Sequence, residues 1–531
     1  MRASKARVLV VVAALTAVAV SAAPAAMRLP SVFSDNMVLQ RGMSVPVWGW
    51  AEAGEKVTVK FAGQEKVATA GADGKWMAKL DAMEASDTPA DMTIADGSGK
   101  ARMLKSILVG EVWLGSGQSN MEMSVGGCLE SEKFRKEATS PAVRMFTVAK
   151  KPAGEARDDV SGRWQVCSPS SVRGFSAVAY FFGRRIHKEL GVPVGLIHSS
   201  WGGTRIEPWT PPCGFQAVGS LQSLVKQIDQ APARWRKDVG EAISRVEAWL
   251  PKAKQALADN GEIPPAPSMP KHSLDSSGSP TGLYNGMIHG LIPFAMRGAL
   301  WYQGESNGGE GKSYYEKKRA LIGGWRKLWG QGDFPFYFAQ LANFMQPNGD
   351  PEGGDGWARV REAQAACLSI PNTGMAVLTD IGDARDIHPK NKQDVGDRLA
   401  LWALAKDYGR KDLVHSGPIC NGSKVDGGRM VLSFDHVGSG LMVGRKEGLA
   451  PTQEVAGGTL KGFSIKGADG KWYWADAKID GKAIVVSSDK VSKPVAARYA
   501  FTTNTDHCNF YNKEGLPAVP FRTDPDWSLR G

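Results

Sequence analysis

Three glycine-rich segments carry serines directly after apolar runs that predict β-strands. Gly-rich turns let backbone N–H groups point at a ligand, and a helix that begins there adds a positive dipole for a developing oxyanion. Hydrolysis by a serine nucleophile is the chemistry that such segments could perform. The segments are Gly115-Ser-Gly-Gln-Ser-Asn-Met-Glu122, Ser199-Ser-Trp-Gly-Gly-Thr-Arg205 and Gln303-Gly-Glu-Ser-Asn-Gly308.

Ser306 matches a familiar pattern, but its surroundings do not suit a nucleophile. Gly304-Glu-Ser-Asn-Gly308 fits the Gly-x-Ser-x-Gly elbow of α/β-hydrolases, in which a helix begins at the serine. Here further glycines follow, and the helical pattern resumes only near Ser313. The same loop lacks the glycine at 306 that a phosphate-binding loop needs. We interpret both matches as chance, whereas Ser119 directly follows a predicted strand and opens a polar turn.

A serine nucleophile needs a base, and the chain offers eight histidines. His388 stands apart because it follows a predicted strand within a polar segment whose three carboxylates could orient an imidazole. The alternative is that His388 caps a helix beginning near Lys392. The other histidines fall in helical, apolar, loop or late β segments. The polar segment reads Asp380-Ile-Gly-Asp-Ala-Arg-Asp-Ile-His-Pro-Lys-Asn-Lys392.

These residues lie in a middle region, residues 105–410, where strand-like runs alternate with helical stretches. That alternation implies an α/β fold with a mostly parallel sheet and helices on both faces. Functional loops should then lie at the carboxyl ends of the strands. The predicted strands include Ile107–Leu114, Gly191–His198, Gly298–Tyr302 and Gly374–Thr379.

Small β domains are predicted on both sides of this region. Residues 27–104 contain short β-rich runs between turn signals, typical of a small sandwich, and residues 411–531 return to β-like runs. Residues 214–280 interrupt the α/β rhythm with one or two amphipathic helices over Leu221–Leu257 and then a Pro/Ser/Gly-rich loop. This insertion is either a lid or a peripheral helical hairpin.

Length, composition and charge limit the class of protein. The 531 residues suggest about three or four domains, and 42% hydrophobic with 22% charged residues excludes disordered, collagen-like and coiled-coil proteins. The net charge of +11 includes no block of about five like charges. We therefore predict a solvated surface and no nucleic-acid partner.

The first 26 residues are predicted to be a secretory signal peptide. A basic start precedes the apolar run Val8–Val20, and small residues follow it. The run is shorter than the roughly 20 residues that span a bilayer. We therefore expect a secreted or periplasmic protein with no membrane anchor after signal removal.

All six cysteines lie beyond this segment, in a compartment that would permit disulfides. The sequence cannot choose among the pairings that six cysteines allow, and buried thiols remain the alternative. None lies in a Cys-x-x-Cys pair, so neither a zinc knuckle nor a thioredoxin-type site is supported.

Separate blocks of the chain, in order and nearly over the whole mature length, form a specific pattern. They are Phe33-Ser-Asp-Asn-Met-Val-Leu-Gln-Arg41, Val45-Pro-Val-Trp-Gly-Trp50, Gly117-Gln-Ser-Asn-Met121, Trp201-Gly-Gly-Thr204, Trp301-Tyr-Gln-Gly-Glu-Ser-Asn307, Phe334-Pro-Phe-Tyr-Phe-Ala-Gln-Leu341, Arg361-Glu-Ala-Gln364 and Asp386-Ile-His-Pro-Lys-Asn391. This pattern resembles the sialate O-acetylesterases, which are SGNH-type (GDSL-like) serine esterases. The helical insertion is the part that the resemblance covers least.

The resemblance implies that Ser119 is the nucleophile and His388 the base. It implies that the backbone N–H of Ser119 and that of Gly202 or Gly203 form part of the oxyanion hole. A catalytic metal or organic cofactor is not expected.

Two departures from the family pattern leave choices open. In the third block the side-chain amide of Gln303 is expected to be the last oxyanion donor, in preference to Asn307. SGNH enzymes usually place Asp three residues before the histidine, but Arg385 stands there. Asp386 is the expected partner of the imidazole, with Asp383 or a backbone carbonyl as alternatives.

The expected function is removal of O-acetyl groups from sugars, above all from O-acetylated sialic acids. Asn120, Arg205 and Glu305 are expected to bind substrate, Arg205 because sialic acid carries a carboxylate. One alternative is an acetylxylan esterase or other polysaccharide acetylesterase. An alternative of another class is a non-catalytic glycan-binding protein on an esterase scaffold.

Overall fold

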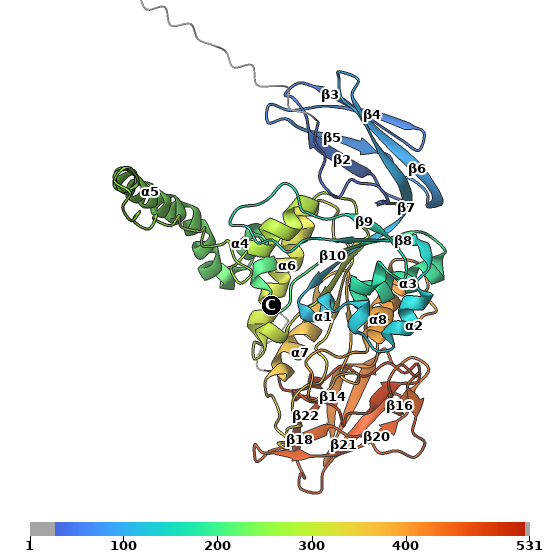
Figure 1. Cartoon of the computed structure of the whole chain (residues 1–531). Coiled ribbons are helices and arrows are strands. Elements are labelled where there is room, and N and C mark those ends of the chain that lie inside the picture. The colour runs from blue at the N-terminus through green and yellow to red at the C-terminus, as the bar shows by residue number, and fades with distance from the viewer. Residues whose placement is uncertain (1–26, 526–531) are drawn as a thin grey trace, which may run out of the picture.

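The computed structural model describes residues 27–525, which form three parts in chain order (Figure 1). A β-rich part comes first, an α/β part with a central sheet follows, and a second β-rich part ends the chain. The predicted signal peptide, residues 1–26, lies outside the described residues.

Two strands of the N-terminal part bury every second side chain. Strand β3 (Lys56–Phe61) and strand β5 (Lys75–Leu80) both alternate exposed and buried residues, which is the pattern of a half-buried strand. Strands β2 and β5 form one antiparallel pair, and β4, β3, β6 and β7 form a second sheet. The other strands are β1 (Val38–Gln40), β2 (Val45–Trp50), β4 (Gln64–Thr69) and β6 (Ser86–Ala95).

Strand β7 (Ala101–Gly117) joins the first two parts without a break. Its first half pairs with β6, and its second half pairs with strands of the central sheet from residue 111 onward. The boundary predicted at residue 104/105 therefore lies inside one strand, and the two parts share a continuous hydrogen-bonded ladder.

The central sheet has the strand order β13-β12-β11-β7-β10-β8-β9. All neighbours in it are parallel except β8 and β9. The chain places β10 on one side of β7 and β11 on the other, so β7 marks a topological switch point. The strands are β8 (Ser140–Thr147), β9 (Trp164–Cys167), β10 (Val194–Ser200), β11 (Gly298–Tyr302), β12 (Phe336–Ala339) and β13 (Thr373–Ala376).

Helices cover both faces of this sheet, as the strand and helix alternation predicts (Figure 1). Helix α3 (Ala177–Leu190) and helix α8 (Lys392–Lys406) pack on one face, while α6 (Lys312–Trp329) and α7 (Trp357–Ala366) pack on the other. Adjacent strand residues point to opposite faces, so Trp301 joins one core and Tyr302 the other. Shorter helices are α1 (Ser119–Glu122), α2 (Ser131–Glu137), α4 (Pro212–Gln216), η1 (Val125–Gly127), η2 (Val172–Gly174), η3 (Glu207–Trp209), η4 (Gly219–Leu221), η5 (Tyr284–Ile288), η6 (His289–Leu291), η7 (Glu305–Asn307) and η8 (Cys367–Ser369).

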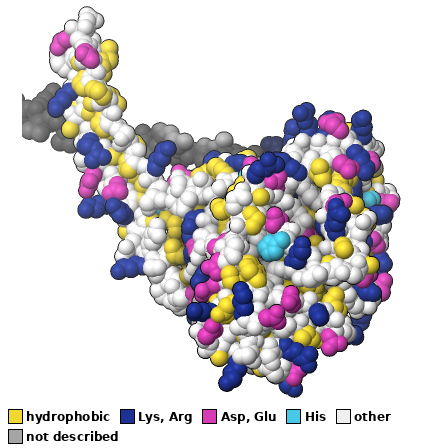
Figure 2. Space-filling view, turned by 90° about the horizontal axis from the view of Figure 1, so that it is seen from below, with side chains coloured by type: hydrophobic (Ala, Val, Ile, Leu, Met, Phe, Trp, Pro, Cys, Tyr) yellow, Lys and Arg dark blue, Asp and Glu magenta, His cyan; other side chains and the backbone are white. Residues whose placement is uncertain are grey.

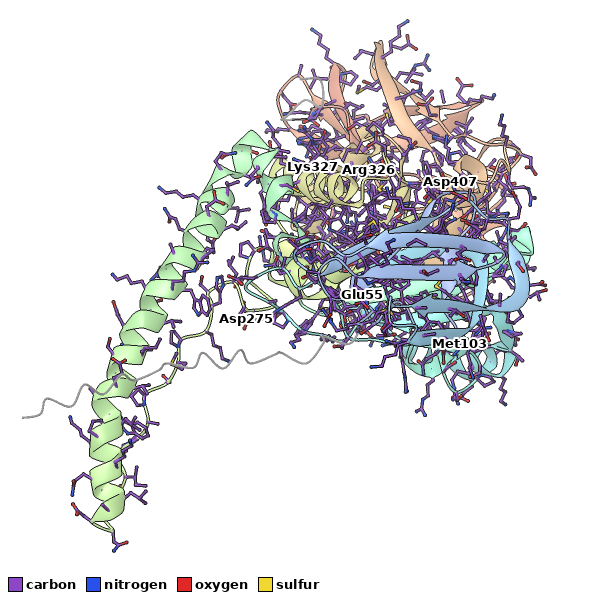
Figure 3. The ribbon with its side chains drawn as sticks, turned by 90° about the horizontal axis from the view of Figure 1, so that it is seen from above. Glu55, Met103, Asp275, Arg326, Lys327 and Asp407 are labelled. Carbon is purple, nitrogen blue, oxygen red and sulfur yellow. The ribbon has the colours of Figure 1, made fainter. Side chains whose placement is uncertain are left out.

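The insertion is one long helix, α5 (Gln222–Ala258), that continues through two prolines. Figures 1 and 3 show it extending away from the body, with the following segment returning along it. The indole N–H groups of Trp235 and Trp249 donate to carbonyls of that segment, at Pro270 (3.2 Å) and Pro264 (2.8 Å). Since the helix leaves the body, it does not cover the cleft described below, and the lid interpretation does not fit this structure.

The described residues of the C-terminal part, up to 525, form antiparallel strands in three sheets. Their orders are β14-β15-β21-β20, β19-β18-β22-β24 and β17-β16-β23. The strands are β14 (Ile419–Asp426), β15 (Arg429–Asp435), β16 (Leu441–Arg445), β17 (Gln453–Glu454), β18 (Phe463–Gly467), β19 (Trp472–Trp474), β20 (Asp476–Asp480), β21 (Ala483–Ser487), β22 (Pro494–Tyr499), β23 (Phe510–Asn512) and β24 (Phe521–Arg522).

The surface carries both signs of charge. Figure 2 shows Lys and Arg side chains interspersed with Asp and Glu over the face that it presents. None of the helices within residues 27–525 is long and apolar enough to cross a membrane.

Candidate active site

Ser119 lies at the carboxyl end of β7, where α1 begins. Two residues earlier, Gly117 has a φ of 139°, and a Cβ there would lie 2.1 Å from the carbonyl oxygen of Tyr302. Only glycine permits β7 and β11 to approach this closely just before the turn. The Ser119 N–H belongs to the first turn of α1, whose amides have no partner within a helix.

His388 faces Ser119 from the loop between β13 and α8. Its Nε2 lies 2.8 Å from Ser119 Oγ, which is hydrogen-bond distance and agrees with the 2.6–3.2 Å expected of a nucleophile and its base. Asn391 rather than His388 caps α8, because its side chain accepts from the Asp394 N–H. His388 is therefore free of the capping role that was its alternative.

Asp386 lies on the other side of the imidazole. Its Oδ1 is 3.5 Å from His388 Nδ1 and accepts the His388 backbone N–H at 2.9 Å. That hydrogen bond, with Lys390 at 3.1 Å, lowers the pKa of Asp386. The alternative Asp383 accepts the backbone N–H of Arg385 instead.

The pKa of His388 is lowered from its ordinary value. Partial burial is the largest cause, and the positive charges of Lys392 and Lys390 act in the same direction, while Asp386 opposes them. A lowered pKa keeps the imidazole neutral near pH 7, which is the form that can accept a proton.

Ser119 and His388 open into a cleft of about 670 Å³. Glu122 and Lys150 also line it, and they form an ion pair. The Gly202 N–H donates to Glu122 Oε2 at 2.5 Å, and a Cβ on Gly202 would lie 3.3 Å from Ser119 Cβ. The backbone amide of Gly202, a predicted oxyanion donor, therefore lies beside the nucleophile and is hydrogen-bonded to the Glu122 carboxylate. Gly203, the next residue of the same turn, is exposed.

The structure contradicts the expectation that Gln303 is an oxyanion donor. Gln303 is completely buried, and its side-chain amide donates to Asn307 Oδ1 (2.7 Å), Gln118 Oε1 (3.2 Å) and Thr204 O (3.3 Å). Its amide hydrogens are used inside the protein, so none faces the cleft. The amide of Asn307 is also occupied, since it donates to Glu207 and Glu310.

Arg205 is not positioned as the substrate-binding cation that the sequence suggested. Its guanidinium pairs with Glu207 and Glu310 and donates to the carbonyl of Ser306 at 3.2 Å. Lys317 joins the same two glutamates. Two carboxylates therefore neutralise two cations, and Arg205 is not among the residues that line the cleft of Ser119. Of the described residues that line this cleft, Lys150 is the one cation.

Asn120 and Glu305 contact each other through their side chains, and neither is among the residues that line the cleft of Ser119. Asn120 is 1% exposed, and its side chain donates to Glu305 Oε1 at 2.5 Å and to the carbonyl of Ile387 at 3.0 Å. Its Oδ1 accepts a hydrogen bond from the buried Lys392. Sequence reasoning missed Lys392, although it shares the buried face of α8 with Val395 and Leu399, at spacings of three and seven residues.

Other groups considered from the sequence take no part in the cleft. The six cysteines are free thiols. Within residues 27–525, no cluster of three or more His, Cys, Asp or Glu side chains could hold a metal ion. Of the aromatic residues near the loops, Trp209, Trp301 and Tyr302 are buried in the core, whereas Trp201 is partly exposed.

Comparison with known families gives one match that covers half of the chain. The family described as "Carbohydrate esterase, sialic acid-specific acetylesterase" matches residues 109–243 and 274–404. The matched residues contain Ser119, Gly202 and His388, and the gap between the two matched ranges falls within the insertion.

Comparison with curated proteins finds similar full-length relatives. The sialate O-acetylesterase of Rattus norvegicus is 30% identical over 541 residues, covering 93% of this chain and 94% of the relative. The sialate O-acetylesterase of Mus musculus is 32% identical, covering 74% of this chain and 75% of the relative.

Among solved structures, a carbohydrate acetylesterase from Xanthomonas citri is similar over nearly the whole length. It is 34% identical, with a TM-score of 0.77, and the match covers 94% of this chain and 100% of that one. The similarity includes both flanking β parts as well as the central sheet.

Proposed function

This chain belongs to the sialic acid-specific acetylesterase family of carbohydrate esterases, and we propose from that membership that its substrates are O-acetylated sialic acids. It is a carboxylic ester hydrolase. We also propose that Ser119 and His388 perform the hydrolysis, and the observation that carries this proposal is the 2.8 Å contact between Ser119 Oγ and His388 Nε2 in an open cleft. The non-catalytic alternative is therefore dropped.

The first half of the reaction forms an acetyl-enzyme. His388 Nε2 takes the Ser119 hydroxyl proton as Oγ attacks the acetyl carbonyl carbon, since serine at its ordinary pKa is a poor nucleophile. The tetrahedral intermediate then collapses, and the sugar oxygen leaves with the proton that His388 returns. Asp386 supports the imidazolium through its charge and its 3.5 Å approach to Nδ1.

Backbone amides of Ser119 and Gly202 stabilise the negative oxygen of that intermediate. Each preset donor is worth about 3 kcal/mol in comparable oxyanion holes. In the resting structure the Gly202 amide is held by Glu122, so this carboxylate must turn away toward Lys150 before the substrate oxygen can use the amide.

The second half releases acetate. Water takes the place of the sugar hydroxyl, His388 accepts its proton, and the new oxygen attacks the acetyl carbon. Collapse of this intermediate breaks the bond to Ser119 Oγ, which regains the proton from His388. Acetic acid leaves and gives its remaining proton to solvent to become acetate, and the enzyme returns to its starting state.

We propose further that the α/β part is an SGNH-type esterase domain. Ser119 follows β7, Gly202 follows β10 and His388 follows β13, which supports the order of blocks in that class. The third block would depart from it, because the amides of Gln303 and Asn307 are tied inside the protein.

A second candidate substrate is a neutral acetylated polysaccharide such as acetylxylan. The charges in the cleft favour it, because Lys150 and Glu122 offset each other and Arg205 lies elsewhere. A cleft whose two charged side chains offset each other does not attract an anionic sugar more than a neutral one.

Acetate release from a substrate panel tests the proposal. O-acetylated sialic acids and acetylated xylan would be compared with the wild type and Ser119→Ala. We expect release from the sialic acids at a higher kcat/KM than from xylan. A preference for xylan would favour the second candidate, and no release from either would overturn the esterase function.

We also propose that the protein is exported to the periplasm or medium, on the sequence of residues 1–26. Expression of the full chain in a secreting host, followed by N-terminal sequencing, tests this. We expect the mature chain to begin between Ala23 and Met27. A protein that stays in the cytoplasm with residues 1–26 uncleaved would contradict this proposal.

A further inference from the structure

A buried polar bridge lies beside the pair Ser119 and His388. Its centre is Asn120, whose side-chain amide donates to Glu305 and whose oxygen accepts from Lys392. The same amide donates to the carbonyl of Ile387 at 3.0 Å. Asn120 directly follows Ser119 in the chain, and Ile387 directly precedes His388. The bridge therefore joins the turn that carries the nucleophile to the loop that carries the base.

The members of the bridge follow the carboxyl ends of three different strands, at one edge of the sheet. Asn120 follows β7, Glu305 lies in η7 after β11, and Lys392 is the first residue of α8, after the loop of β13. Lys392 has no exposed surface, and its ammonium also lies 5.1 Å from the ring centre of Tyr302. Burying charged or polar groups here is costly unless partners satisfy them. Asn120 satisfies one oxygen of Glu305 and accepts from Lys392, while Glu305 Oε2 has no hydrogen-bond partner among the described residues.

We propose that Lys392 and Glu305 are positioning residues that act through Asn120 to hold Ser119 opposite His388. The inference rests on the proposed roles of Ser119 and His388. Loss of either end would leave Asn120 free to turn, and the Ser119 turn would then lose its register with the His388 loop. A misplacement of about 1 Å can cost about 100-fold in rate.

Charge gives this bridge a second effect on the base. Burial lowers the pKa of Lys392 to about 7, the negative charge of Glu305 opposes that shift, and burial raises the pKa of Glu305. The charge of Lys392 lowers the pKa of His388. Other charged groups that face His388 are Asp386 and Lys390 from its own loop and, across the cleft, Glu122 and Lys150.

A matched control exists in the same domain. Lys318 of α6 also has no exposed surface, and burial lowers its pKa to about 7. Its ammonium lies 3.0 Å from the ring centre of Phe338 and has no hydrogen-bond acceptor among residues 27–525. Phe338 belongs to the core on the α6 face, opposite the face of Tyr302. Lys318 thus shares the burial of Lys392 without the bridge.

The test compares Lys392→Met with Lys318→Met in the complete mature enzyme. Readouts are kcat and KM on p-nitrophenyl acetate, the pH profile of kcat/KM, and the rate of fluorophosphonate labelling. For Lys392→Met we expect kcat to fall about 10–100-fold with KM within about twofold. The acid limb of its profile should move to higher pH, because removing a positive charge raises the pKa of His388. Lys318→Met should match the wild type in kcat and profile.

Glu305→Gln keeps the shape of the side chain and provides a second test of the bridge if Lys392→Met does not fold. It should lower kcat about tenfold with KM unchanged, and Lys392→Met/Glu305→Gln should lose little more than the worse single variant, since both act through Asn120. Wild-type kcat in Glu305→Gln, or equal effects of Lys392→Met and Lys318→Met, would overturn the positioning role. If instead Ser119→Ala stays active, the proposed function itself fails.

Discussion

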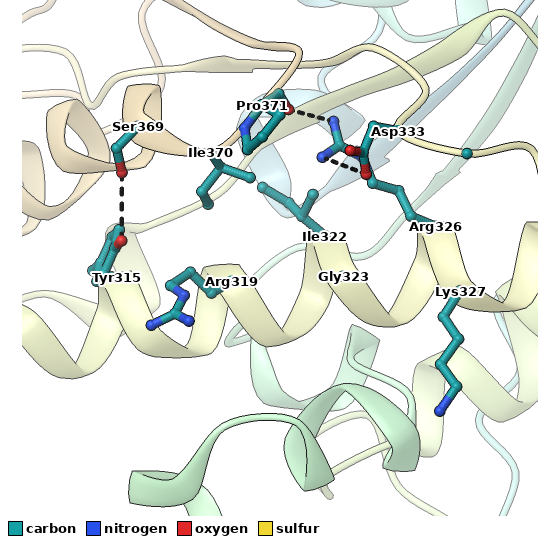
Figure 4. A pocket seen from close by; sticks show the side chains of 11 residues that line it. Tyr315, Arg319, Ile322, Gly323, Arg326, Lys327, Asp333, Ser369, Ile370 and Pro371 are labelled. Atoms are coloured by element: carbon teal, nitrogen blue, oxygen red, sulfur yellow. Dashed lines mark hydrogen bonds and ion pairs between the residues drawn. The ribbon is translucent and has the colours of Figure 1, made fainter. Parts of the chain in front are cut away.

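Two cavities lie at different edges of the central sheet. At the carboxyl ends of β7 and β10, a cleft of about 670 Å³ contains Ser119 and His388. Beside the amino ends of β12 and β13, a groove of about 780 Å³ lies between α6 and the turn before β13 (Figure 4). The groove is larger, yet the described residues that line it include no pair of nucleophile and base.

The polar groups of the groove are used to hold the fold together. Arg326 donates to the carbonyls of Phe334 (2.8 Å), Pro371 (2.8 Å) and Asn372 (3.2 Å), and lies 3.5 Å from Asp333. In the cleft, by contrast, the Ser119 hydroxyl and the imidazole of His388 contact each other and face open space. The larger cavity is therefore not the active site. The active site lies instead where the loops at the carboxyl ends of the strands meet.

The largest expected effect is the loss of esterase activity when the cleft residues Ser119 and His388 are replaced. Ser119→Ala and His388→Ala should each lower kcat/KM about 10⁴–10⁶-fold, and the double variant should lose little more, because the pair acts as one unit. The rate of p-nitrophenyl acetate hydrolysis measures this. Ser306→Ala is the control and should remain within about twofold of the wild type. Full activity in His388→Ala would contradict the assignment of the base.

A smaller loss is expected when only the orientation of the base changes. Asp386→Asn should lower kcat/KM about 10–100-fold, because its Oδ1 is 3.5 Å from Nδ1 and is shared with the His388 backbone N–H. The acid limb of the pH profile should move to lower pH, since the Asp386 charge raises the pKa of His388. A loss as large as that of His388→Ala would instead make Asp386 indispensable.

The pH profile of the wild type gives a milder effect. His388 must be neutral to accept a proton, and its pKa is lowered by burial and by neighbouring lysines. Activity should therefore be half-maximal below about pH 6.5, the ordinary pKa of histidine, and should be retained from there to neutral pH. Measurement of kcat/KM between pH 4.5 and 8 checks this, and a midpoint at or above about 7 would contradict it.

The smallest effect on activity is expected in the groove. Arg326→Met should lower the free energy of unfolding by about 2–4 kcal/mol, because carbonyls lose a buried charged donor. The kcat/KM of the folded enzyme should stay within about twofold. Arg319→Met, an exposed position on the same helix, should change stability by less than about 0.5 kcal/mol. Urea unfolding and kcat/KM give both quantities, and lost activity in folded Arg326→Met would link the two edges.

Much of the fold could be predicted because local pattern and tertiary structure agree. The predicted strand Gly298–Tyr302 is β11 as the structure has it, and the predicted strands Gly191–His198 and Gly374–Thr379 overlap β10 and β13. The shared boundary strand β7 was not visible, since its polar first half reads as an end of the β domain. Nor did the two prolines of α5 show whether one helix or two would form.

Only those site residues whose position follows from the end of a strand could be predicted from the sequence. Ser119 and His388 both follow strands, and parallel strands end at one edge, so their meeting was foreseeable. The predictions for Gln303 and Arg205 were wrong because their side chains bind other side chains of the protein, such as Asn307 and Glu310. Residue type alone cannot show whether an amide or a guanidinium is already occupied.

Trapping the acetyl-enzyme tests the central claim most directly. The wild type would be mixed with p-nitrophenyl acetate, quenched in acid within the first turnovers, digested and mapped by mass spectrometry. We expect an added acetyl group on Ser119, absent from Ser119→Ala and unchanged in Ser306→Ala. Fluorophosphonate labelling should map to the same residue. An acetyl group or label on Ser306, or turnover by Ser119→Ala at the wild-type rate, would contradict the account.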